Sequence, residues 1–248
     1  MRIVGIVFAG LFTLLFYGGT NYYIGKRLFQ GLTFLFPHMN AAMFAGIGLF
    51  IALSIFLAIV PMPAGLKGIL RWISAYWMGI YVYLLILFLL VDLLLFLGGI
   101  THILPVPVPQ SLRFYLGLLV IGLTAGLAVY GVGNANRIEK VSYNIQLNKT
   151  GLGDGIKIIL ISDLHLGAVH SEKRLPGIVR DINQLKPDLV CIAGDIFDDD
   201  YFAIHDPEKA ITLLKDITAT YGVYACLGNH DGGKTFNEML RFLEQSNV

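Results

Sequence analysis

Hydrophobic and polar positions divide the chain into two parts. Up to Val132 apolar residues run almost without a break, and four stretches approach or exceed the roughly 20 apolar residues that a helix needs to cross a bilayer. These stretches are Ile3–Tyr23, Ala41–Val60, Trp72–Leu97 and Leu112–Val132. Proline, glycine and charged residues separate them. We therefore predict an N-terminal α-helical transmembrane bundle of four helices over residues 1–133.

After Gly133 the apolar runs are shorter, and segments typical of strands alternate with segments that have the apolar spacing of helices. The predicted strands are Ile156–Ile161, Leu189–Ala193 and Val223–Leu227. The predicted helices are Glu172–Leu185, Pro207–Ile217 and a third that starts at Phe236. Strands that alternate with helices predict a parallel sheet with right-handed crossovers. Residues 156–248 are therefore an expected α/β domain. The alternating segment Val141–Leu147 predicts an edge strand within a linker of residues 134–155.

The composition supports a membrane-bound chain. It is 56% hydrophobic and 14% charged, against about 25% charged residues in soluble domains. We expect a lipid bilayer to be one partner. The formal net charge of +1 provides no strong basic field, so no nucleic-acid preference is expected.

The basic residues predict the orientation of the helices. Four spans place both ends of the helical region on the same side of the membrane. The basic residues on that side are Arg2, Lys67, Arg71, Arg137 and Lys140. Lys26, Arg27 and Arg113 fall on the other side. The positive-inside rule then predicts a multi-pass cell-membrane protein whose soluble domain is cytoplasmic.

Asp92 lies inside the third predicted span, where a carboxylate is by default a candidate functional residue. Three alternatives leave its role open. It could sit near the interface, be protonated, or pair with Arg113. The two cysteines, Cys191 and Cys226, lie in apolar strand-like runs without C-x-x-C spacing, so we expect both to be buried core residues.

Polar residues follow each predicted strand of the α/β domain. Asp163 and His165 follow the first strand, Gly194-Asp195 the second, and Gly228-Asn229-His230-Asp231 the third. Ligands of open α/β sheets collect beyond the carboxyl ends of the strands. Each motif alone is common, but the ordered set predicts that these side chains converge on one edge.

Ser162-Asp163-Leu164-His165, Gly194-Asp195 and Gly228-Asn229-His230-Asp231 resemble the first three signature blocks of the calcineurin-like metallophosphoesterases. The resemblance covers about Val141 to the C-terminus. It is closest to bacterial membrane-associated members with N-terminal transmembrane helices. It implies the first half of a four-layer α/β/β/α sandwich and a dinuclear metal site.

The resemblance also implies the metal ligands. Asp163 and His165 would hold one ion, Asn229 the other, and Asp195 would bridge them. Two cations about 3.5–4 Å apart suit hydrolysis of a phosphate ester. Mixed oxygen and nitrogen donors favour divalent or mixed-valence Mn, Fe, Zn or Co.

By the same resemblance, His230 is the catalytic histidine that protonates the leaving oxygen or steadies the phosphoryl group. Asp231 would orient the His230 imidazole and raise its pKa. Other polar residues favour a simpler interpretation. The run Asp198, Asp199 and Asp200 could bind a cation, but we expect a solvated loop; His170 and His205 could contact substrate, but we expect exposed loop histidines.

Nothing after Asp231 matches the further histidine and the Gly-His-x-His block of that family. We therefore expect a truncated domain that binds metal weakly, hydrolyses little, leaves one sheet face uncovered and anchors its terminal helix poorly. The predicted function is a membrane-anchored metal-dependent phosphoesterase acting on phosphomonoester, phosphodiester or pyrophosphate bonds, with a substrate that could be lipid-linked. The alternative is a non-enzymatic membrane interaction or regulatory protein with a degenerate phosphoesterase remnant.

Overall fold

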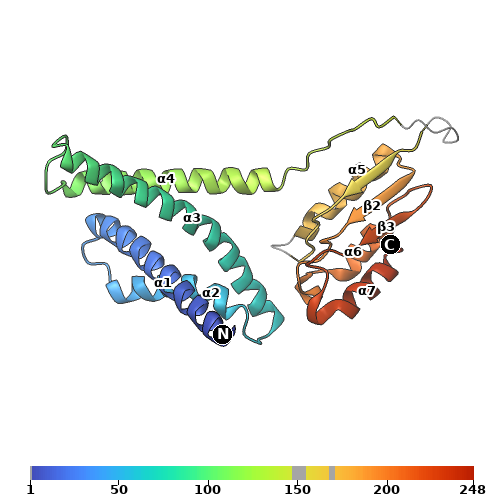
Figure 1. Cartoon of the computed structure of the whole chain (residues 1–248), viewed down its shortest axis with the longest axis horizontal. Coiled ribbons are helices and arrows are strands. Elements are labelled where there is room, and N and C mark those ends of the chain that lie inside the picture. The colour runs from blue at the N-terminus through green and yellow to red at the C-terminus, as the bar shows by residue number, and fades with distance from the viewer. Residues whose placement is uncertain (1, 147–154, 168–170) are drawn as a thin grey trace. The chain divides into compact units, whose positions relative to one another are not determined.

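The computed structural model describes residues 2–146, 155–167 and 171–248. The chain divides into two compact units, Met1–Ile138 and Glu139–Val248 (Figure 1). This division lies close to the predicted one, although the assigned boundaries at residues 133 and 155 remain predictions.

The first unit consists of four helices. They are α1 (Arg2–Leu35), α2 (Ala41–Leu57), α3 (Ala64–Ile100) and α4 (Gln110–Ala135). Helix α1 contacts the other three, and a small core forms where Ile24 of α1, Phe88 of α3 and Val120 of α4 are almost fully buried. A polar contact joins α1 to α2: the Tyr17 hydroxyl donates to the Ala52 carbonyl at 3.0 Å.

Two of the helices are suited to a membrane by length and composition. Residues Gly65–Ile100 and Gln110–Ala135 are long and apolar enough to cross one, whereas the apolar helix α2 has 17 residues. Their side chains are largely exposed, as Leu94 (57%) and Val129 (74%) illustrate. Exposed apolar surface of this extent marks an interaction with lipid or protein. Two candidate spans among the described residues support membrane association, and the four-span topology remains a prediction.

Asp92 pairs with Arg27 of α1 and not with Arg113. Arg27 Nε donates to Asp92 Oδ2 at 3.1 Å, a second guanidinium nitrogen forms an ion pair with the same oxygen, and the Tyr23 hydroxyl donates to it at 2.6 Å. The alternative of an Asp92–Arg113 pair is therefore wrong, because the packing of α1 against α3 places Arg27, and not Arg113, next to the carboxylate.

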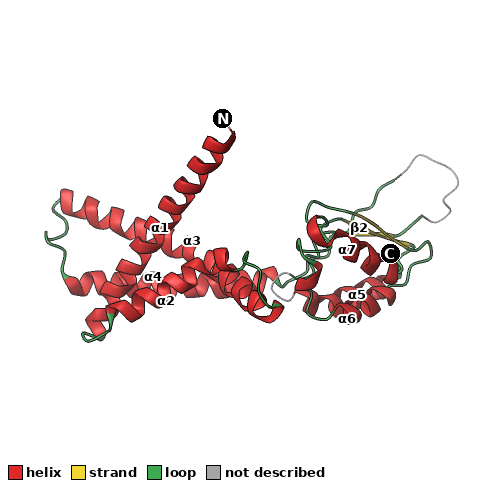
Figure 2. Cartoon of the chain, turned by 90° about the horizontal axis from the view of Figure 1, so that it is seen from below, coloured by secondary structure: helices red, strands yellow, loops and turns green. Residues whose placement is uncertain are grey.

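The second unit is an α/β domain with a parallel sheet, as predicted (Figure 2). Its elements are β1 (Ile158–Ile161), α5 (Leu175–Leu185), β2 (Leu189–Ala193), α6 (Pro207–Lys215), β3 (Val223–Cys226) and α7 (Phe236–Gln245). The strand order is β1-β2-β3, with Ile158 opposite Leu189 and Val190 opposite Val223. Both crossovers advance in the same direction, so right-handed connections place α5 and α6 on one face.

That face holds the core of the unit. Val190 and Ile192 of β2 pack with Leu175 and Val179 of α5 and with Leu214 of α6, all of them buried. The opposite face is uncovered, since Leu160 is 69% and Tyr224 61% exposed. One helical layer on one sheet is the arrangement expected for the first half of the four-layer sandwich.

Three local predictions differ from the structure. Residues 141–146 form no strand, and Tyr143 is 82% exposed. Among the residues that the structure describes, β1 pairs only with β2, so this segment has no neighbouring strand there to satisfy its backbone. Leu147 lies outside the described residues. Cys226 is exposed and Cys191 half-buried, because parts of β2 and β3 face the uncovered side.

The third difference concerns α7, which is well anchored. Met239, Phe242 and Leu243 are buried in the same core as α5 and α6. The Phe242 ring packs edge-on against the Phe197 ring, with centroids 5.2 Å apart. The expectation of a poorly anchored helix was wrong, because α7 covers the helical face of the unit and does not depend on the second sheet.

Candidate metal centre

The loops that follow the three strands converge at one end of the sheet, as predicted from their order. Backbone pairing continues beyond β1 and β2: the His165 N–H donates to the Asp195 carbonyl at 3.0 Å, and the Leu166 N–H donates to the Ile196 carbonyl at 2.8 Å. The first two loops therefore run side by side. The loop after β3 joins them through His230, whose N–H donates to Asp195 Oδ1 at 3.1 Å.

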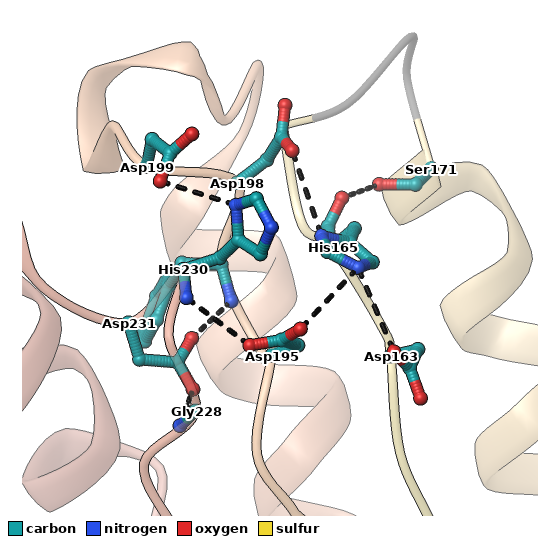
Figure 3. Close-up of polar contacts among 10 residues, drawn as sticks. Asp163, His165, Ser171, Asp195, Asp198, Asp199, Gly228, His230 and Asp231 are labelled. Carbon is teal, nitrogen blue, oxygen red and sulfur yellow. Dashed lines mark hydrogen bonds and ion pairs between the residues drawn. The ribbon is translucent and has the colours of Figure 1, made fainter.

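The backbone is unusual at three of the predicted ligands. Asp163, His165 and Asp195 have φ angles of 56°, 43° and 50°, a left-handed conformation that is uncommon for residues other than glycine. Such conformations cluster at functional sites, where the surrounding structure must hold them in place. Here each one turns a side chain toward the shared space beyond the strand ends (Figure 3).

His165 lies between two carboxylates. Its Nε2 atom is 3.8 Å from Asp163 Oδ1 and 3.9 Å from Asp195 Oδ2. These gaps exceed a hydrogen bond, which spans about 2.7–3.2 Å for nitrogen and oxygen. They do suit atoms that share a metal ion, since each ligand then sits about 2.0–2.2 Å from the ion. Asp163, His165 and Asp195 thus form a group that could hold an ion.

Two glycines create room for Asp195. A Cβ atom on Gly228 would lie 2.1 Å from Asp195 Oδ1, and one on Gly194 would lie 2.9 Å from the Gly228 backbone. Gly194 also has a positive φ of 78°. Any side chain at either position would separate the ends of β2 and β3.

Asp231 makes different contacts from those predicted. Its carboxylate is almost fully buried, and its oxygens accept the Phe197 and Gly228 N–H groups, each at 2.8 Å. Both oxygens are therefore directed at backbone N–H groups. Asp231 ties the third loop to the second, and the carboxylate that contacts the His230 ring is that of Asp199.

Asp198 and Asp199 reach the site from the loop after β2 (Figure 3). Asp199 Oδ1 lies 3.1 Å from His230 Nδ1, and Asp198 Oδ1 lies 3.5 Å from His165 Nδ1. The hydrogen bond to Asp199 raises the pKa of His230, and the negative charges of Asp199, Asp195 and Asp198 add to this effect.

Asp198 together with His165 and His230 forms a second group that could hold an ion. The sequence left cation binding by the Asp198–Asp200 run open and favoured a solvated loop; it did not single out Asp198 as a ligand. Asp198 stands three positions after Asp195, and this spacing was the only available signal.

The donor set fits metal binding. The Nδ1 atom of His165 is buried and makes no hydrogen bond with the described residues. Asn229 is exposed in the turn after β3, and its side chain makes no hydrogen bond with the described part of the chain, which leaves its oxygen available. His205 is exposed in the loop before α6; His170 lies outside the described residues. Carboxylate oxygens and imidazole nitrogens are ligands of Mn, Fe, Zn and Co.

Comparison with known proteins agrees with this chemistry. Residues 156–248 match the family model described as calcineurin-like phosphoesterase. An uncharacterized metallophosphoesterase of Bacillus subtilis is 35% identical over 130 residues, which cover 50% of this chain and 44% of the relative. A transmembrane protein with metallophosphoesterase domain of Danio rerio is 34% identical over 46% of this chain and 26% of its own length.

A third relative has a more specific name. The UDP-2,3-diacylglucosamine pyrophosphatase of Chlamydia trachomatis is 33% identical over 40% of this chain and 29% of its own length. The chain spans less than half of the length of each of these three relatives. No solved structure shows a significant match. The strand-end motifs, the parallel sheet and these matches agree, and the second unit of this chain contains part of a calcineurin-like phosphoesterase domain.

Proposed function

We propose that the chain is a membrane-anchored metal-dependent phosphoesterase. The observation that carries the proposal is the arrangement around His165 Nε2, which lies 3.8 and 3.9 Å from carboxylate oxygens of Asp163 and Asp195. We assign Asp163 and His165 to one ion, Asn229 to the other and Asp195 to both. When bound, two such ions supply a nucleophile at neutral pH and neutralise charge on the phosphoryl group.

The residues of the chain then have separate tasks. Asp195 is oriented by the His230 N–H, which accounts for one of its oxygens and leaves the other facing His165. We assign to His230 the donation of a proton to the leaving oxygen, a role supported by the neighbouring Asp199 carboxylate, which raises the pKa of the imidazole. Asp198 is a further candidate ligand beside His165.

The substrate class follows from the membrane unit and one relative. We propose a phosphomonoester, phosphodiester or pyrophosphate with a lipid-linked portion, because the first unit has two helices suited to a membrane. The relative named as a UDP-2,3-diacylglucosamine pyrophosphatase acts on a substrate of that kind. The proposed location is the cell membrane, with several spans and a cytoplasmic second unit.

The test uses the full chain purified in detergent, with manganese content and hydrolysis of an aryl phosphate ester as readouts. We expect low, manganese-dependent turnover that Asp195→Asn abolishes, since Asp195 is shared by both ions. His230→Ala should lower turnover more than metal content, because a general acid contributes about 10²–10⁴-fold. Asp216→Asn, an exposed carboxylate after α6, is the control. Turnover that survives Asp195→Asn would contradict the mechanism, and a chain without manganese binding would favour the non-enzymatic alternative.

A further inference from the structure

A pocket of about 250 Å³ lies within the first unit, between the C-terminal part of α1, α3 and the start of α4. Its charged and amide side chains are Arg27, Gln30, Asp92, Gln110 and Arg113. The rest of the lining is mostly apolar and includes side chains of α3 and Phe114 of α4. A pocket that holds charged side chains between otherwise apolar helices is a candidate binding site.

The charge of Arg27 is already balanced. Asp92 Oδ2 accepts from Arg27 Nε at 3.1 Å and from the Tyr23 hydroxyl at 2.6 Å, and it also forms an ion pair with a terminal nitrogen of Arg27. The other terminal nitrogen of Arg27 is directed toward Gln30, with its Nη1 atom 3.5 Å from Gln30 Oε1. The Arg27–Asp92 pair is therefore close to neutral and fixed in position.

The charge of Arg113 is not balanced within this unit. Among the residues that the structure describes, its side chain makes no ion pair or hydrogen bond, and it is exposed. Asp92 is the only acidic residue among positions 1–138, and it is engaged by Arg27. The pocket therefore carries about one net positive charge, which is complementary to an anionic group from outside the unit.

We propose that this pocket binds a phosphate group, carried by a membrane lipid or free in solution. A guanidinium group matches phosphate oxygens with two parallel hydrogen bonds. Gln30 and Gln110 line the same pocket and carry amide donors, and a phosphate has several acceptor oxygens to meet them. Pockets that enclose a whole small ligand span roughly 300–1,000 Å³, so this smaller pocket suits a headgroup. The site lies wholly in the first unit and is independent of the proposed hydrolysis.

The experiment measures binding to the full chain in an uncharged detergent by native mass spectrometry. The probes are a short-chain phosphatidic acid, the diacylglycerol with the same acyl chains, and inorganic phosphate. We expect one saturable phosphatidic acid per chain and no such binding of the diacylglycerol. Competition by inorganic phosphate would show that the phosphate group alone is sufficient, and absence of competition would show that the lipid portion is required.

Three variants test the site itself. Arg113→Gln should weaken phosphatidic acid binding about tenfold or more, because it removes charge-assisted hydrogen bonds. Lys26→Gln removes an equal charge one position from Arg27 but outside the pocket, so it should change binding by no more than about twofold. Gly117→Leu should block binding, since Gly117 lines the pocket and has open space at its Cβ position. Equal effects of Arg113→Gln and Lys26→Gln, or equal binding of the diacylglycerol, would overturn the proposal.

Discussion

Asp199 Oδ1 lies 3.1 Å from Nδ1 of His230, although the two residues are 31 positions apart in the sequence. This contact stabilises the charged imidazole and raises the pKa of His230.

Replacing Asp199 by asparagine should therefore lower the pKa of His230 toward its ordinary value. The carboxylate is both the hydrogen-bond acceptor and the nearest negative charge, and asparagine keeps the shape while removing the charge. Asp198→Asn should lower the pKa less, because Asp198 acts only through its charge. The measurement is an NMR titration of the His230 ring in the metal-free chain. Equal shifts in the two variants would show that the hydrogen bond contributes nothing.

Asp231→Ala should destabilise the second unit without acting through the His230 ring. The Phe197 and Gly228 N–H groups would both lose their acceptor, at a cost of about 2–4 kcal/mol in the free energy of local opening. Hydrogen exchange of β2 and β3 amides in the full chain measures this loss. Asp216→Ala, at an exposed position, should leave the same amides protected. Unchanged protection in the Asp231 variant would contradict the structural role.

Gly228→Ala should displace Asp195 and reduce the manganese content of the chain. The new Cβ would lie 2.1 Å from Asp195 Oδ1, a distance that forces the carboxylate or the β3 loop to move. Gly232→Ala is the matched control, because a Cβ there has no atom within 4 Å. Elemental analysis of both purified variants checks the prediction, and equal metal contents would mean that the close approach of the two loops is not needed for binding.

The exposed Cys226 reports the side of the membrane on which the second unit lies. In intact cells it should resist a membrane-impermeant maleimide and should react after permeabilisation, as the distribution of basic residues predicts. The half-buried Cys191 is replaced by serine so that one thiol remains, and a Cys191→Ser, Cys226→Ser chain gives the background. Labelling of intact cells would place the unit on the outer side.

The local patterns of the sequence were sufficient for the element types and for the parallel sheet. Runs such as Leu189–Ala193 formed a strand with the predicted bounds, and the ligand motifs fell where the strands end. The reason is that periodicity and chain order restrict which faces are buried and which ends of parallel strands coincide. Alternation over residues 141–146 was insufficient, because a strand also requires a neighbour to pair with.

Contacts between distant segments were decided only by the tertiary structure. Asp199, and not the adjacent Asp231, contacts the His230 ring, and Arg27, and not Arg113, pairs with Asp92. In both cases several partners had the right charge and a suitable position in the sequence. Electrostatic attraction is strong only between charges that lie a few ångströms apart. Which charges come that close depends on how loops and helices pack in three dimensions.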